Sequence, residues 1–160
     1  MTLPTRKPNR LKNFDYSQNG AYFITVCIKN RNPILSEITV GADIIRPYEV
    51  RLSEIGKTVD CAIKNIPKCY CGVSVDNYVI MPNHVHLIIT INNDSGRMVS
   101  APTIVAGFKR YVSRQAGCSV WQKGFYDHVI RDFYDYQIKY QYIDDNPAKW
   151  REDELYQNLS

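Results

Sequence analysis

Apolar residues recur along this chain with two different periods, one of strands and one of helices. Alternating or continuous runs of β-branched and aromatic residues predict four strands, at residues 21–29, 73–81, 84–92 and 125–131. The run at 84–92 is apolar on both faces, which is typical of a buried central strand. Pro82 and Asn83 indicate a bend between the second and third runs, so these form either one bent strand or a pair.

Three other segments carry apolar residues at helical spacing, at residues 53–66, 103–116 and 133–146. Ser53 is a suitable N-cap for the first helix, and Pro67 is expected to stop it. Pro147 disfavours a helical backbone at Asn146, so the last helix is expected to end there. Residues 34–52 resemble a ribbon or hairpin, interrupted at Gly41 and Asp43.

The order strand, helix, two strands, helix, strand is that of a split βαβ unit. We therefore predict an α+β fold with this split βαβ pattern. With 160 residues, 44% of them hydrophobic, the chain can bury one core, so we expect one domain at 14–155 with polar tails at 1–13 and 156–160.

Two histidines stand one residue apart in the third strand run. Side chains alternate along a strand, so His84 and His86 point the same way with roughly 6 to 7 Å between their Cα atoms. The pair could bind a metal ion. Alternatively, the two histidines could be hydrogen-bonded within the protein or have no special role.

A tyrosine and an asparagine share one face at the end of the last predicted helix. Tyr142 and Asn146 are four residues apart, so they could serve one site as a nucleophile and a metal ligand. The alternative is a core tyrosine and a helix-terminating asparagine. Tyr140 competes as nucleophile, but two positions along a helix turn it about 200° away from Tyr142.

Three motifs in this order resemble the single-tyrosine HUH transposases, and among them the REP-associated tyrosine transposases: Met81-Pro-Asn-His-Val-His86, Phe125-Tyr-Asp-His-Val-Ile-Arg131 and Tyr142-Ile-Asp-Asp-Asn-Pro-Ala-Lys-Trp150. The resemblance implies that His84, His86 and Asn146 bind a divalent metal, Mg²⁺ or Mn²⁺, and that Tyr142 is the nucleophile. It implies a ferredoxin-like or RRM-like sandwich, in which an antiparallel sheet carries helices on one face, and this agrees with the split βαβ order. It also implies cleavage and rejoining of single-stranded DNA beside hairpins, by monomers or by homodimers that exchange helices. The chain departs from many relatives at Asp144 and Asp145, which add negative charge beside the site.

Several further residues are candidates for contact with nucleic acid. Lys109, Arg110 and Arg114 lie near the polar side of the second predicted helix, where they could meet phosphates or stay solvated. His128 could be an auxiliary residue at the scissile phosphate or a structural histidine. The net charge of +4 permits nucleic-acid binding without requiring it.

Three alternatives stay open. Cys69 and Cys71 could join His84 and His86 in a structural zinc site, although Cys-x-Cys is a less usual spacing than Cys-x-x-Cys. The chain could also be a catalytically silent nucleic-acid-binding module, or a metal-dependent phosphodiesterase in which the histidines activate water.

An odd number of cysteines without a signal-peptide pattern or membrane-length apolar run favours a cytoplasmic protein with no membrane contact.

Overall fold

The computed structural model describes residues 10–41, 48–94 and 98–156. Its strands are β1 (Gly20–Cys27), β2 (Ser36–Val40), β3 (Tyr48–Leu52), β4 (Val73–Ile80), β5 (His84–Ile91) and β6 (Tyr126–Ile130). Its helices are α1 (Glu54–Cys69), α2 (Ala101–Ala116) and α3 (Phe133–Asp145), with 3₁₀ turns η1 (Lys29–Arg31) and η2 (Trp150–Glu152).

Four strands form the main sheet in the order β4-β5-β1-β6, and every neighbouring pair is antiparallel. This order, with α1 and α2 as the connections, is the split βαβ arrangement, so the predicted α+β fold is confirmed. β4 and β5 are a hairpin rather than one bent strand, because Met81, Pro82 and Asn83 turn the chain back.

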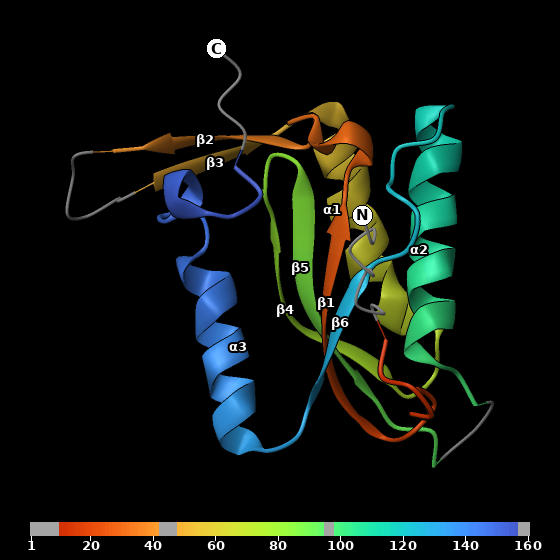
Figure 1. Cartoon of the computed structure of the whole chain (residues 1–160). Helices are drawn as coiled ribbons and strands as arrows, with labels where there is room; N and C mark the ends of the chain where they lie inside the picture. The colour runs from red at the N-terminus through yellow and green to blue at the C-terminus, as the bar shows by residue number, and fades with distance from the viewer. Residues whose placement is uncertain (1–9, 42–47, 95–97, 157–160) are drawn as a thin grey trace, which may run out of the picture.

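The sheet is covered on both faces (Figure 1). Helices α1 and α2 lie against one face, where Ile24, Leu87 and Ile89 join the larger apolar core. Helix α3 lies against the other face, where Ile143 packs with Phe23 and Ile88. The expectation of helices on one face therefore describes α1 and α2, while α3 follows the split βαβ unit and covers the face that this unit leaves open.

The predicted boundaries of the helices are close to those observed. Ser53 is the N-cap of α1 and accepts a hydrogen bond from the Gly56 N–H. The expectation that Pro67 stops this helix is wrong, because α1 continues to Cys69. A proline in the last turn removes only one late backbone hydrogen bond, so two more residues can follow it. Helix α3 ends at Asp145, close to the predicted end, but Asn146 keeps helical backbone angles (φ −58°, ψ −44°), so the expectation that Pro147 moves Asn146 out of the helical region is wrong.

The predicted ribbon at 34–52 is the two-stranded sheet of β2 and β3, which projects from the rest of the structure (Figure 1). Asp43, one of its predicted interruptions, lies outside the described residues, as do residues 1–9 and 157–160 of the predicted tails. Within the described ranges, no helix combines the length and the apolar character needed to cross a membrane.

Candidate metal and tyrosine site

The two histidines lie side by side on the α3 face of the sheet. Val85 and Leu87 of β5 point into the larger core, so alternation directs His84 and His86 to the opposite face. Both side chains are buried, and their Nε2 atoms are 3.0 Å apart. The sequence prediction that they point the same way is confirmed.

Neighbouring polar groups hold each imidazole in place through its Nδ1 atom, the nitrogen that faces away from the other histidine. The Asn83 amide nitrogen donates to the Arg31 and Leu155 carbonyls, so its Oδ1 is the acceptor for His84 Nδ1–H at 2.7 Å. This leaves the lone pair of His84 on Nε2. Thr25 Oγ1 is 2.7 Å from His86 Nδ1 and can orient that ring in the same way. Such partners of the distal nitrogen are typical of metal-binding histidines.

Helix α3 brings Tyr142 and Asn146 to the histidines. The Tyr142 ring lies edge-on to His86 with 5.3 Å between ring centroids, and 46% of the residue is exposed. Asn146, one turn later, is buried, and its Oδ1 makes no hydrogen bond within the described part of the chain. The Tyr140 ring instead packs against Tyr136. The tyrosine that faces the histidines is therefore Tyr142.

A carboxylate that sequence reasoning missed completes this cluster. Asp153 Oδ2 is 3.8 Å from His84 Nε2, and it too is buried without a hydrogen bond among the described residues. The candidate ligand atoms of His84, His86 and Asp153 all lie within 4.8 Å of one another. Hydrogen-bonded turns after α3, the last of them η2, lead the chain to this residue.

Burial sets the protonation of the site. Burial lowers the pKa of His84 and of His86, and the proximity of His84 lowers that of His86 further, so both imidazoles are neutral near neutral pH. Burial and the charge of Asp153 raise the pKa of Tyr142, while the nearby Asn146 amide lowers it. The site therefore offers neutral imidazoles for metal binding and a protonated phenol.

An open hollow gives access to the cluster from solvent. It has a volume of about 260 Å³ and is lined by Tyr142, Asp145, Asn146, Lys149, Glu152, Asp153 and Glu154. Most of the charged residues in this lining are acidic, which favours a cation at its base.

Asp144 and Asp145, the positions at which the chain differs from many REP-associated relatives, each have a polar partner. Asp144 accepts a hydrogen bond from the Asn77 amide, and Asp145 accepts one from Gln141 and lies 3.5 Å from Lys149 Nζ. Their charges are therefore partly offset by neighbouring donors.

His128 belongs to β6 and lies beside the first turn of α3, at the end of the helix away from Tyr142. Its Nε2 is 2.7 Å from the Asp135 carboxylate, in the first turn of the helix. Asp135 precedes Tyr142 by seven residues, or roughly 10 Å along a helix. This placement favours the structural interpretation of His128, as an anchor for the start of α3.

The basic residues predicted to contact nucleic acid lie on α2, across the sheet from the histidines (Figure 1). Lys109 donates to the carbonyls of Gln122 and Gly124, so it has a structural role. Arg110 and Arg114 are exposed. Helical spacing identified a polar side of α2 but could not show which face of the sheet the helix would cover.

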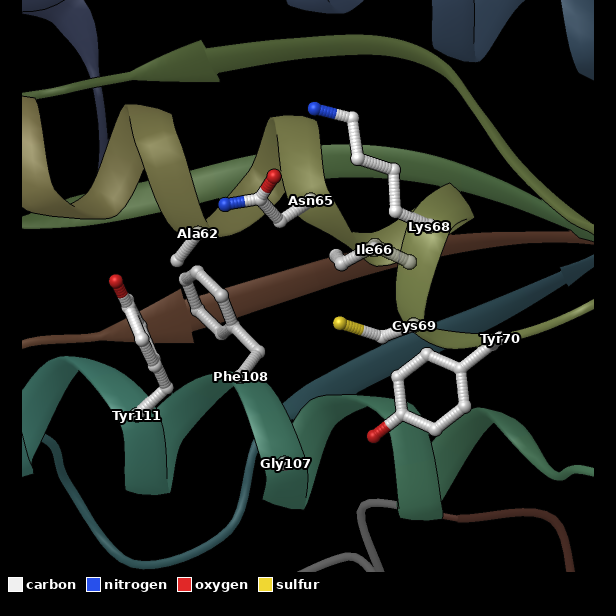
Figure 2. A pocket seen from close by; sticks show the side chains of 9 residues that line it. All are labelled: Ala62, Asn65, Ile66, Lys68, Cys69, Tyr70, Gly107, Phe108 and Tyr111. Carbon is white, nitrogen blue, oxygen red and sulfur yellow. The ribbon is translucent and has the colours of Figure 1, made fainter.

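The alternative zinc site is not formed. Cys69 lines a second hollow of about 220 Å³ between α1 and α2, on the side of the sheet away from the histidines. Figure 2 shows Phe108 and Tyr111 of α2 facing Ala62 and Cys69 of α1 across this space. Its lining is mainly apolar, whereas the ligand-type side chains gather around His84 and His86.

Comparisons with known proteins find sequence relatives of this chain. The chain is 33% identical to an uncharacterized protein of Haemophilus influenzae, with 94% of this chain and 93% of that protein covered. It is 24% identical to a REP-associated tyrosine transposase of Escherichia coli, covering 84% of this chain and 70% of that protein. No family model matches the chain.

A solved structure of a REP-associated tyrosine transposase bound to a REP hairpin has the same fold. The TM-score is 0.65 at 21% identity, covering 88% of this chain and 74% of that one.

The fold is that of a solved REP-associated tyrosine transposase, and sequence relatives at 24% identity carry the names of such transposases. The chain belongs to the same family as the Haemophilus protein, and it is a relative of the REP-associated tyrosine transposases, as its motifs predict.

Proposed function

We propose that this protein nicks single-stranded DNA beside hairpins and transfers the cut strand through a 5′-phosphotyrosine intermediate, with the help of a divalent metal. The observation that carries the proposal is the position of the Tyr142 ring against His86, beside two Nε2 atoms that are 3.0 Å apart. A nucleophile and a metal-binding pair at this separation can act on the same phosphate.

The residues of the site fit a divalent metal. Two bonds of about 2.1 Å at right angles place the ligand atoms about 3.0 Å apart, which is the observed separation of the two imidazole nitrogens. Asn146 Oδ1 is a buried oxygen without a hydrogen bond in the described structure, as a third ligand atom would be before a metal binds. Nitrogen and oxygen ligands together suit Mg²⁺ or Mn²⁺. When bound, the ion would neutralise charge on a non-bridging oxygen of the scissile phosphate.

Tyr142 is the proposed nucleophile. Its phenolic oxygen attacks phosphorus and loses its proton, while the bond from phosphorus to the 3′ oxygen breaks and that oxygen takes up a proton. The products are a 5′-phosphotyrosine and a free 3′-hydroxyl, and a 3′-hydroxyl can reverse the step to join a strand. Because burial raises the pKa of Tyr142, the proton must be lost as the attack proceeds.

All the residues of the proposed site come from one chain. Tyr142 lies against His86 of its own sheet, so the proposed nucleophile and the proposed metal ligands come together here without exchange of α3 between subunits. This arrangement supports action as a monomer, and a homodimer would then serve another purpose.

The surface beside Tyr142 suits an unpaired strand. Tyr134 and Ile138 precede Tyr142 at four-residue steps, so they form one stripe along α3, and they are 73% and 48% exposed. Exposed aromatic side chains stack with bases irrespective of their sequence. The related structure bound to a REP hairpin supports a hairpin as the paired part of the substrate.

The first prediction tests the nucleophile. Tyr142→Phe removes one oxygen and keeps the packing of the ring, so binding of a hairpin oligonucleotide should persist while the covalent adduct disappears. The measurement is a denaturing gel of a labelled oligonucleotide incubated with the protein and Mn²⁺, with Tyr140→Phe as the matched control.

Each outcome of this assay distinguishes the proposed activity from its alternatives. An adduct that persists in Tyr142→Phe assigns the nucleophile to another tyrosine. Binding without any adduct in the wild type favours a silent binding module. Free product ends without an adduct favour a phosphodiesterase, in which Tyr142 only packs.

A further inference from the structure

We propose that Asp153 is a fourth protein ligand of the metal ion, and that metal binding thereby fixes the C-terminal segment, residues 150–156, in place. The inference rests on the proposed metal-dependent function. It adds to that function a ligand and a link between the metal and a segment outside the sheet and α3.

The two oxygens of the Asp153 carboxylate have different environments. Oδ1 accepts a hydrogen bond of 2.7 Å from the Leu155 N–H, which holds the carboxylate in its orientation. Oδ2 is buried, makes no hydrogen bond in the described ranges and lies 3.8 Å from His84 Nε2. Two atoms bound to one ion at about 2.1 Å each lie at most about 4.2 Å apart, so this separation is compatible with a shared ion.

The charge of the cluster also favours a carboxylate ligand. His84, His86 and Asn146 supply only neutral ligands, because an imidazole binds a metal ion in its neutral form. A buried carboxylate is costly unless a cation lies beside it, and Mg²⁺ and Mn²⁺ bind carboxylate oxygens readily. One ion at this position satisfies both requirements.

A second connection joins the same segment to the histidines. The Asn83 amide donates to the Leu155 carbonyl at 2.8 Å, and its oxygen accepts from His84 Nδ1–H at 2.7 Å. The Trp150 ring lies 5.9 Å from the His84 ring, and the Tyr156 ring lies 5.1 Å from Trp150. Residues on both sides of Asp153 are thus packed or hydrogen-bonded to the His84 side of the site.

The test is metal affinity measured by titration calorimetry with Mn²⁺ alone, on the full chain. Asp153→Asn keeps an oxygen for the Leu155 N–H and removes the charge and the preferred metal ligand. We expect it to weaken Mn²⁺ binding by about tenfold or more, as loss of groups around a metal commonly does. Glu152→Gln and Glu154→Gln remove the same charge from the flanking residues of the same hollow, and they should change the affinity by no more than about twofold.

Hydrogen exchange provides a readout that does not depend on activity. Mn²⁺ should slow exchange of the Leu155 and Tyr156 amides in the wild type and in both Glu variants, but not in Asp153→Asn. Equal affinity in Asp153→Asn and the two controls, or equal slowing of exchange, would overturn the inference.

His84→Ala separates this failure from failure of the proposed function. If His84→Ala abolishes Mn²⁺ binding while Asp153→Asn binds like the wild type, Asp153 is not a ligand but the metal site stands. If His84→Ala also binds like the wild type, the metal-dependent function itself is wrong.

Discussion

At the scale of single residues, the proposed metal binding depends on side chains that are not themselves proposed ligands. His84 and His86 can present Nε2 to a metal only if their Nδ1 atoms carry protons. Asn83 sets this tautomer for His84, because its amide nitrogen already donates to two carbonyls. Thr25 is the corresponding partner of His86, on the neighbouring strand β1, where it is paired directly with that histidine.

The prediction at this scale concerns Thr25. Thr25→Val keeps the shape of the side chain but leaves the His86 Nδ1–H without its acceptor, so Mn²⁺ affinity should fall by roughly tenfold. Thr25→Ser restores the hydroxyl and should recover most of the affinity. Calorimetric titration of the three proteins checks this, and an unchanged affinity in Thr25→Val would mean that packing alone orients His86.

Sequence alone was sufficient for residues whose spacing lies within one element. His84 and His86 share a strand, and Tyr142 and Asn146 share a helical turn, so each pair could be assigned to one face in advance. Asp153 could not be predicted in this way. Its position depends on the turns between α3 and residue 153, where no periodic pattern indicates the direction of the chain.

At the scale of elements, α3 carries the proposed nucleophile and packs on a face of the sheet with a small apolar cluster. Polar contacts supplement that packing. Tyr136 donates to Asp76 Oδ2 at 3.1 Å, and the same oxygen accepts from Thr90 at 2.6 Å. His128 and Asp135 join the start of the helix to β6. The geometry of Tyr142 therefore rests on hydrogen bonds as well as on burial.

The prediction at this scale is that Tyr136→Phe lowers the free energy of unfolding by about 1 kcal/mol, because Asp76 loses one donor. Tyr134→Phe makes the same change on the exposed side of α3 and should have no measurable effect. Denaturant titration of the two variants and the wild type measures the difference. Equal stabilities would show that the Tyr136 hydroxyl contributes nothing to the position of α3.

The difference in stability between the wild type and Tyr136→Phe should also depend on pH. Burial and then the charge of Asp76 raise the pKa of Tyr136 to about 12, above the ordinary value near 10. A raised pKa means that the folded state holds this proton more tightly than the unfolded state does. The difference between wild type and Tyr136→Phe should therefore be constant below about pH 10 and shrink as the pH rises toward 12. A difference that grows over this range would contradict the assignment.

At the scale of the whole molecule, the sheet separates the two predicted groups of functional residues. The metal and tyrosine site lies on the α3 face, and Arg110 and Arg114 lie on α2, which covers the other face (Figure 1). A substrate that contacts both must pass around the edge of the sheet. The contribution of these two arginines stays a prediction, and the surface along α3 is the more direct path to Tyr142.

The last prediction concerns the substrate. In the proposed reaction Tyr142 attacks a phosphate that enters the hollow of about 260 Å³ lined by Tyr142, Asn146 and Asp153, and this requires a strand that can bend locally. An unpaired strand bends and turns out its bases, whereas a perfect duplex holds both strands in a stiff helix. We therefore expect hairpin-forming oligonucleotides to be bound and cut beside the foot of the hairpin, and the matching duplex to be left intact.

Binding should weaken as salt rises, because a chain of net charge +4 attracts the phosphates electrostatically. Hairpins from the repeats flanking its own coding region are the proper test substrates, with binding measured at several salt concentrations and cleavage on a denaturing gel. Equal cleavage of the hairpin strand and its duplex would refute the single-strand assignment, even if Tyr142 formed the adduct.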